Sequence, residues 1–147
     1  RICTLRAEYV EPVRIKKKLF ADDLVNKKFE RGLNPMDENC IFCKIIKGDI
    51  PSNKVYEDDK MLAIHDVAPA APVHVLLLPK EHTANVTTAD PALVAYMLSK
   101  VKEIAEKTGI YEKGFRVVMN TGEDGGQTVN HLHIHVIGGK ALGWPPC

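Results

Sequence analysis

The sequence lacks a long hydrophobic run. Its 147 residues contain no apolar stretch that approaches the roughly 20 residues a membrane-spanning helix needs. The N-terminal region also lacks the apolar stretch of a signal peptide. We therefore expect a cytoplasmic protein that has no membrane partner.

An excess of one sign of charge is also missing, because 20 basic residues are balanced by 19 acidic ones and the net charge is +1. The charge is nevertheless uneven along the chain. Residues 1–35 carry nine Lys or Arg against five acids, a balance of +4, and the remainder carries eleven against fourteen, a balance of −3. A nucleic-acid-binding domain would concentrate positive charge on its folded part. We therefore expect no nucleic-acid partner.

Cysteine is scarce, with four residues at positions 3, 40, 43 and 147. Only Cys40 and Cys43 lie close together, in the C-x-x-C segment Cys40-Ile41-Phe42-Cys43. In a chain without a signal peptide, this spacing indicates metal or redox chemistry before a structural disulfide. The motif alone is a weak signal, and two free thiols are the alternative.

The chain does have enough apolar residues for one core, because 45% of it is hydrophobic. A chain of this length is expected to form a single domain. Residues 1–35 hold apolar residues at mixed spacing and end in the breaker Gly32-Leu33-Asn34-Pro35. We interpret residues 1–35 as an N-terminal extension, either a poorly ordered arm or a cloning remnant, and residues 36–147 as the folded domain.

Two helices and five strands are predicted. The apolar residues of segment 41–46 recur at helical spacing, so a short helix carries the cysteine pair and ends near Gly48. A longer helix begins with Asp90 as its N-cap and Pro91 at its first position, and it ends near Gly109. We expect strands over residues 55–57, 61–65, 73–78, 114–120 and 131–137. This order favours an α+β domain with a meandering five-stranded antiparallel sheet, one long helix and one short helix.

The most informative segment is His131-Leu132-His133-Ile134-His135. Side chains of a strand alternate between its two faces, so the three histidines share one face and the residues between them point into the core. Three neighbouring imidazoles lose hydration and repel one another when charged. Packing alone would not select them, although a half-exposed polar strand face is the alternative.

These residues resemble the histidine-triad (HIT) superfamily. The similarity covers about three quarters of the chain, from about Asn39 to its end. It rests on the three histidines and also includes Cys40 to Ile46, His65-Asp66, Asn120 and Gly125-Gly126-Gln127-Thr128. The tail Trp144-Pro145-Pro146, after Gly138-Gly139, resembles the Hint branch of purine nucleoside phosphoramidases. The final Cys147 departs from the Gly with which that branch usually ends.

The resemblance implies a HIT-like fold, a homodimer whose strands join into one larger sheet, and a purine nucleotide substrate. The expected reaction is hydrolysis of the P–N bond of purine nucleoside 5′-phosphoramidates, such as AMP-amine or AMP-lysine compounds. The alternatives are a dinucleotide polyphosphate hydrolase like the Fhit branch, a nucleotidyl transferase, and a zinc-stabilised nucleotide-binding scaffold protein. No organic cofactor is expected.

Four residues are predicted to be catalytic. His133 is flanked by imidazoles on both sides, and a largely neutral imidazole can attack phosphorus and form a nucleotidyl-histidine that water then hydrolyses. The resemblance implies that His135 orients the ring or bonds the phosphate, and that His74 relays protons. Thr128 can donate a hydrogen bond to the developing charge.

The expected substrate contacts fall into three groups. Glycines of segment 121–128 allow main-chain N–H groups to approach phosphate oxygens, although an ordinary surface loop is the alternative. Asp66 can accept hydrogen bonds from both ribose hydroxyls, and a turn cap is its alternative. An apolar slot for the purine would be formed by Ile41, Phe42, Ile45, Ile64 and Val67. Apart from the resemblance these residues would simply be core, and we expect them to serve as both. The full set is Ile41, Phe42, Ile45, Ile64, Asp66, Val67, Asn120, Gly126, Gln127, Thr128, His133, His135 and Trp144.

A structural zinc ion is also implied. In HIT proteins that keep the cysteine pair, the two thiolates, a histidine at the position of His82 and the first triad histidine bind the metal. Here those ligands are Cys40, Cys43, His82 and His131. Two cysteines and two histidines suit tetrahedral Zn²⁺. The alternative is a pair of free thiols and a surface histidine.

Overall fold

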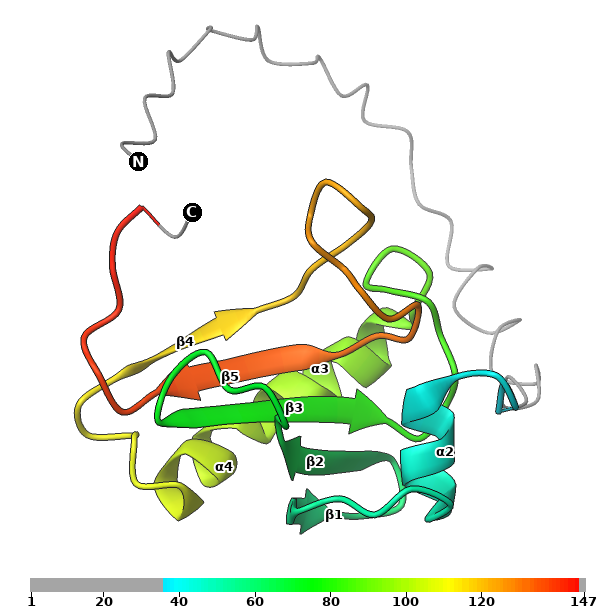
Figure 1. The fold of residues 1–147 in the computed structure, drawn as a ribbon, viewed down its shortest axis with the longest axis horizontal. Helices are drawn as coiled ribbons and strands as arrows, with labels where there is room; N and C mark the ends of the chain where they lie inside the picture. Colours follow the sequence, from blue (N-terminus) through cyan, green and yellow to red (C-terminus); the bar gives the residue numbers. More distant parts are fainter. Residues whose placement is uncertain (1–35, 146–147) are drawn as a thin grey trace, which may run out of the picture. The chain divides into compact units, whose positions relative to one another are not determined.

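Five strands form one antiparallel sheet in the order β1-β2-β3-β5-β4 (Figure 1). The computed structural model describes residues 36–145, and its element labels are those of Figure 1. The strands are β1 (Lys54–Glu57), β2 (Met61–His65), β3 (Val73–Pro79), β4 (Phe115–Val118) and β5 (Ile134–Gly138). The helices are α2 (Ile41–Lys47), α3 (Pro91–Ser99) and α4 (Val101–Lys107). The α+β class and the five-stranded antiparallel sheet are therefore confirmed.

The described residues fall into two units. Residues 36–142 form the compact unit that contains every described helix and strand, and residues 143–145 belong to the other unit. The predicted N-terminal extension, residues 1–35, lies outside the described residues, as do residues 146–147.

The strand order differs from a simple meander at one step. The chain passes in sequence through β1, β2 and β3, but β5 then lies between β3 and β4. Between β3 and β4 the chain forms α3 and α4, which lie behind the sheet in Figure 1. After the two helices the chain therefore forms the edge strand β4. β5 then lies between β4 and β3, with His135 opposite Leu76 of β3.

Two apolar clusters pack on the two faces of the sheet, because side chains alternate along each strand. The first joins the sheet to α3 and α4 and includes Met61, Leu77, Met97, Ile104 and Ile134. The second joins the sheet to α2 and includes Phe42, Cys43, Leu62, Ile64 and Leu78. The short helix is thus held on the face opposite the long one.

Two of the predicted helix boundaries, at Asp90 and Gly48, have the expected chemistry. Asp90 caps α3 by accepting a hydrogen bond of 2.8 Å from the N–H of Ala92. At the end of α2, Gly48 adopts φ 90°, a left-handed conformation that glycine enters without strain. The predicted long helix is bent and is divided between α3 and α4 at Lys100.

The bend has a local cause. The hydroxyl of Ser99 donates to the carbonyl of Tyr96 at 2.6 Å, so it competes for an acceptor of the helix. The N–H of Lys100 then bonds the carbonyl of Met97, three residues back, at 3.1 Å. Such a tightened turn interrupts the regular helix while the buried stripe continues through Met97 and Ile104.

The strand that carries the histidines is shorter than predicted. β5 begins at Ile134, so His131 and His133 precede the ladder and only His135 lies within it. The alternation nevertheless continues outside the ladder. Leu132 and Ile134 are buried in the cluster under α3 and α4, whereas Phe42 of α2 contacts the rings of His131 and His133.

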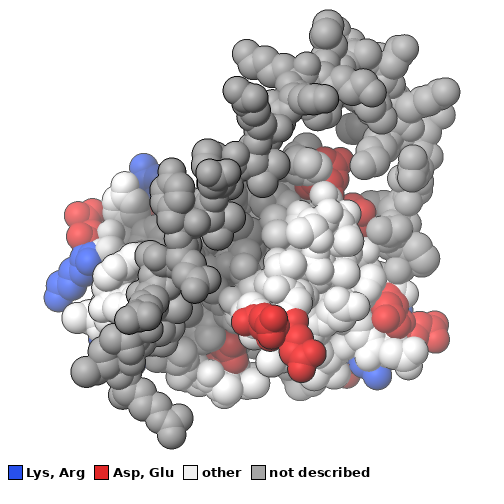
Figure 2. Space-filling model, turned by 90° about the horizontal axis from the view of Figure 1, so that it is seen from above, with Lys and Arg blue, Asp and Glu red and all other residues white. Residues whose placement is uncertain are grey.

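The described surface mixes charges of both signs. Among the side chains visible in Figure 2, acidic groups lie at the centre and on both sides of the face, and basic groups lie near its margins. Within the described residues, no helix combines the length and the apolar character that crossing a membrane would require.

Candidate functional site

The predicted nucleophile is held by the main chain. The ring Nδ1 of His133 lies 2.7 Å from the carbonyl oxygen of His131, and a carbonyl can only accept a hydrogen bond. Nδ1 therefore carries the proton, and in the neutral ring Nε2 carries the free lone pair. His133 is 5% exposed, so the ring is buried but not sealed from a ligand. This is the tautomer that a nucleophilic Nε2 needs.

His74 and His135 form a directed pair beside it. The N–H of Ala70 donates to Nδ1 of His74 at 3.2 Å, so the proton of the neutral His74 ring is on Nε2. That Nε2 lies 2.8 Å from Nδ1 of His135 and donates to it. The proton of His135 is consequently on its own Nε2. This atom is buried and has no hydrogen-bond partner among the described residues.

An unpartnered buried donor is costly, and such a donor in a cluster of histidines points to a ligand. The rings of His133 and His135 lie with centroids 4.9 Å apart, nearly at right angles. The lone pair of His133 Nε2 and the N–H of His135 Nε2 therefore belong to one site. An acceptor oxygen next to an electrophilic atom would match both groups.

Burial keeps the rings of His74 and His135 neutral. Burial is the largest of the causes that together lower the pKa of His135 to about 4; the neighbouring His133 and His74 also lower it, whereas Asp66 opposes the shift. Burial also lowers the pKa of His74, against the opposing effect of Asp66. At neutral pH both rings therefore act as the N–H donors and lone-pair acceptors described above.

Asp66 has the turn-cap role that the sequence left open, and it also approaches the pair. Its Oδ1 accepts a hydrogen bond from the N–H of Ala68 at 2.8 Å, and its Oδ2 lies 3.5 Å from Nε2 of His74. The side chain is 17% exposed. One carboxylate oxygen is thus occupied by the turn, which leaves Oδ2 as the more available acceptor.

The predicted purine slot is only partly apolar core. Phe42 and Ile64 are buried in the cluster beneath α2, and Ile45 packs against that cluster. Ile41 is 48% exposed and Val67 is 99% exposed. The expectation that all five residues would double as core is therefore wrong for Ile41 and Val67, because helix position and the loop after β2 place them at the surface.

The loop before the histidines differs from its prediction at Gln127. The amide Nε2 of Gln127 donates to the carbonyls of Ala84 and Val129 at 2.7 and 2.9 Å, and Oε1 accepts from the N–H of Gly122. Both N–H bonds of the amide are thus used within the protein. The side chain thus braces two loops, and its contact with a substrate stays a prediction.

The glycine pair in this loop has a structural reason. A Cβ at Gly125 would clash with the carbonyl oxygen of Thr121, and Gly126 adopts φ 74°. Asn120 makes a 3.5 Å contact from its amide to the carbonyl of Gly126, and Thr128 is exposed. Their role toward a phosphate group stays a prediction, as does that of Trp144, which lies in the other unit.

The four predicted metal ligands lie together. Nδ1 of His131 is 3.5 Å from the sulfur of Cys40 and 3.5 Å from that of Cys43. Nδ1 of His82 is 3.3 Å from the sulfur of Cys43 and 3.2 Å from Nδ1 of His131. All four potential ligand atoms fall within 4.8 Å of one another.

This spacing fits a tetrahedral ion. With Zn–S near 2.3 Å and Zn–N near 2.0–2.1 Å, tetrahedral ligands stand about 3.6 Å apart for sulfur and nitrogen and about 3.3 Å apart for two nitrogens. The ring of His131 is also prepared for the role, because its Nε2 donates to the carbonyl of Pro79 at 3.0 Å. Its Nδ1 is therefore the free lone pair, and Nδ1 is the atom that faces the cysteines.

The protonation of these groups suits a metal in part. Burial lowers the pKa of His131 to about 4, with His82 and His133 adding to the shift, so the ring is neutral. Burial raises the pKa of the Cys43 thiol, so metal binding has to displace its proton. The residues therefore could hold zinc, with two thiolates and two neutral imidazoles.

A further triplet, Asp66, His74 and His135, brings possible ligand atoms within 4.8 Å of one another. The two ring nitrogens, however, lie 2.8 Å apart while the ring centroids are 5.1 Å apart. The nitrogens thus face each other directly, as in a hydrogen bond, and their lone pairs do not converge on a common point. We interpret this triplet as a hydrogen-bonded chain.

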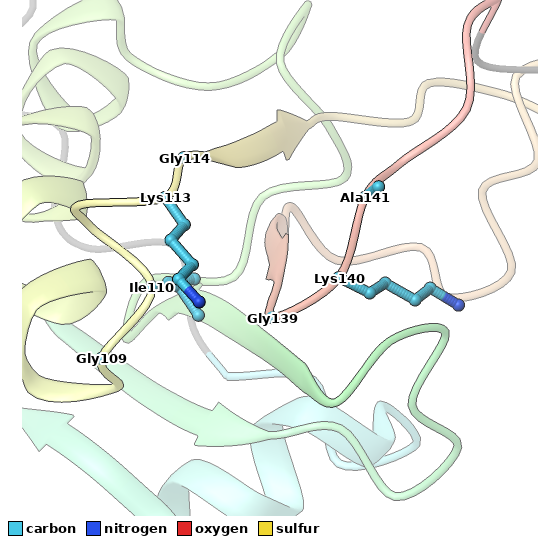
Figure 3. A pocket seen from close by; sticks show the side chains of 7 residues that line it. All are labelled: Gly109, Ile110, Lys113, Gly114, Gly139, Lys140 and Ala141. Atoms are coloured by element: carbon cyan, nitrogen blue, oxygen red, sulfur yellow. The ribbon is translucent and has the colours of Figure 1, made fainter.

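A separate pocket of about 370 Å³ lies at the other end of β5 (Figure 3). It is lined by Gly109, Ile110, Lys113, Gly114, Gly139, Lys140 and Ala141. In Figure 3 the side chain of Lys113 reaches toward Ile110, while that of Lys140 extends away from it. None of the predicted catalytic or metal-binding residues lines this pocket.

Sequence reasoning missed two contributors to the site. Ala70 fixes the tautomer of His74, and Thr83 accepts a hydrogen bond of 2.6 Å from the N–H of Leu132, next to His131. Both act through main-chain atoms, which every residue has. No side-chain pattern could therefore have identified them.

The HIT domain model matches residues 47–142, about two thirds of the chain. The chain belongs to the HIT domain family. An uncharacterized HIT-like protein of Synechococcus elongatus is 54% identical over 114 residues, which are 76% of this chain and 99% of that protein. The 14 kDa zinc-binding protein of Zea mays is 42% identical over 123 residues, 80% of this chain and 95% of that one.

The fold agrees with solved structures of the family. A HIT family hydrolase from Legionella pneumophila Philadelphia 1 superposes with a TM-score of 0.72 and is 42% identical, covering 74% of this chain and 100% of that one. The bent long helix and the five-stranded sheet are thus those of HIT proteins. The comparisons support a hydrolase at this coarse level.

Proposed function

We propose that this HIT protein is a nucleotide hydrolase that cleaves the P–N bond of purine nucleoside 5′-phosphoramidates through a covalent nucleotidyl-histidine on His133. The observation that carries the proposal is the hydrogen bond from Nδ1 of His133 to the carbonyl of His131. In the neutral ring this hydrogen bond leaves the lone pair on the buried Nε2, which can act as the nucleophile. The family's named hydrolases support the reaction class.

In the first step, the lone pair of His133 Nε2 forms a bond to the α-phosphorus while the P–N bond to the amine breaks. His133 then carries a positive charge, and the carbonyl of His131 stabilises it through the retained Nδ1–H. The buried Nε2–H of His135 donates to a phosphoryl oxygen.

The departing amine needs a proton. We propose that His135 releases its Nε2 proton from the phosphoryl oxygen to the amine nitrogen. The Nε2 proton of His74 then shifts to Nδ1 of His135, and Nδ1 of His74 takes up a proton from solvent. In the second step water attacks phosphorus, the bond to His133 breaks, and one proton returns to solvent. Proton uptake and release therefore balance over the cycle.

We further propose that Cys40, Cys43, His82 and His131 hold a structural zinc ion. The metal would clip α2 to the segment that precedes β5 and keep the ring of His131 neutral. The Zea mays relative is named for zinc binding, which supports this part of the proposal. We also propose that the protein forms a homodimer and is cytoplasmic.

The test compares an adenosine 5′-phosphoramidate with a diadenosine polyphosphate as substrates of the full chain. We expect faster turnover of the phosphoramidate, and a mass increase of one nucleotidyl group on His133 in rapidly quenched samples. His133→Ala should lower kcat by at least about 10³-fold while AMP binding persists. Equal inertness of both proteins, with AMP still bound, would instead favour a nucleotide-binding scaffold.

A further inference from the structure

One peptide group joins the predicted metal site to the proposed nucleophile. The peptide between His131 and Leu132 donates its N–H to the carbonyl of Thr83 at 2.6 Å. Its C=O accepts the Nδ1–H of His133 at 2.7 Å. Hydrogen bonds in such a chain polarise one another, so the position of this peptide affects the bond to the His133 ring.

This peptide is connected to two of the predicted metal ligands. Thr83 directly follows His82, and the peptide carbonyl belongs to His131 itself. The ring of His131 is fixed on one side by the carbonyl of Pro79 and faces both cysteine sulfurs on the other. An ion bound by His82 and His131 would therefore fix the position of the Thr83 carbonyl relative to the His131–Leu132 peptide.

Phe42 provides a second contact between the two sites. Its ring meets those of His131 and His133 edge-on, with centroids 5.8 and 5.2 Å apart. Phe42 lies on α2 between the two cysteine ligands and is 8% exposed. Movement of α2 after loss of the metal would thus reach His133 through this ring as well.

We infer that occupancy of the Cys40–Cys43–His82–His131 site sets the tautomer and orientation of His133 through the His131–Leu132 peptide. The metal site is then a positioning device for the nucleophile, and His131 is a positioning residue. The consequence for catalysis rests on the proposed function, but the effect on the His133 ring does not.

The experiment uses the full chain with ¹⁵N-labelled histidine, loaded with Zn²⁺ or stripped by a chelator, and ¹⁵N NMR of the ring nitrogens. Comparison with His133→Ala assigns the His133 signals. With zinc we expect the Nδ1–H tautomer alone. Without zinc we expect both tautomers, together with a fall in kcat of about tenfold or more and a smaller change in KM. A metal-free protein that keeps the single tautomer would overturn the inference.

Two variants keep the test decisive. His82→Ala removes a half-buried ring and leaves the cysteines in place, so it tests the coupling if the zinc-stripped wild type unfolds. We expect both tautomers of His133 in this variant. Ile104→Val lowers stability in the cluster on the other face of the sheet and should keep one tautomer. A mixture in Ile104→Val would show that the tautomer follows general stability, which also contradicts the inference.

Failure of the proposed function gives a different result. If the zinc-loaded protein neither turns over the phosphoramidate nor forms a nucleotidyl-histidine, the reaction is wrong, whatever the NMR shows. If it does both and the tautomer is independent of zinc, only the coupling is wrong.

Discussion

At the scale of single residues, main-chain groups decide which nitrogen of each histidine carries its proton. The carbonyl of His131 makes His133 a donor at Nδ1, and the N–H of Ala70 makes His74 an acceptor at Nδ1. The sequence predicted that His131, His133 and His135 act together, because they alternate with apolar residues, and the role of His74 came from the resemblance to the HIT superfamily. It could not predict their tautomers, because the bonding partners are peptide groups of other segments.

His74→Ala tests the paired imidazoles. The change removes the N–H that His135 Nδ1 accepts, so the proton of His135 is free to leave Nε2. We expect kcat for an adenosine phosphoramidate to fall by about 10² to 10⁴, the usual range for loss of general acid–base help. Steady-state kinetics measure the effect, with AMP affinity as the control for an intact site. An unchanged kcat would exclude His74 from the proton pathway.

At the scale of elements, the site depends on how α2 and the loops of residues 66–72, 80–90 and 119–133 are tied to the sheet. β5 begins only at Ile134, after His133, so hydrogen bonds from the loops replace the ladder there. Gln127 supplies three of them, to the main chain at Gly122, Ala84 and Val129. Sequence reasoning assigned this side chain to a substrate because a surface amide in a glycine-rich loop has the right chemistry for either role.

Gln127→Ala is expected to lower the free energy of unfolding by about 1–3 kcal/mol, because it leaves partly buried main-chain groups without partners. Asn120→Ala is the matched control in the same loop. Its amide makes a single contact of 3.5 Å, so the expected change is below about 0.5 kcal/mol. Urea unfolding measures the free energy of unfolding of both variants. An equal loss in the two would contradict the bracing role of Gln127.

Cys40→Ser tests the metal clip between α2 and the histidine segment. Cys40 precedes the first residue of α2, and its sulfur faces Nδ1 of His131. We expect the purified wild type to contain one zinc per chain, and the variant to lose it and to melt at a lower temperature. Metal analysis and calorimetry measure the two effects. Zinc-free wild type that melts like Cys40→Ser would disprove the metal site.

At the scale of the whole molecule, burial of several imidazoles makes stability depend on pH. The pKa of folded His135, about 4, lies below the value of about 6.5 expected for an unfolded histidine. Between these values the unfolded chain binds more protons than the folded one, so protonation favours unfolding. The stabilisation that the folded state gains from the neutral His135 ring is complete above about pH 6.5 and is lost as the pH falls toward 4.

We therefore expect the urea midpoint to fall between pH 7 and pH 5. In His135→Gln, which has no proton to bind there, the fall should be smaller. It should not vanish, because burial also lowers the pKa of His74 and His131. A variant that follows the wild type across this range would contradict the lowered pKa of His135.

The order of residues was enough to predict the helices, the five strands and the shared face of the histidines, because these follow from local signals: apolar periodicity, the Asp90 cap and the Gly48 stop. The set of four possible zinc ligands came instead from the resemblance to the HIT superfamily, and the structure brings the four side chains together. Only the tertiary structure decided the place of β5 beside β3, the exposure of Val67, the use of Gln127 as a brace and the proton on each imidazole. These depend on contacts between segments far apart in the chain, and main-chain donors and acceptors leave no trace in the order of side chains.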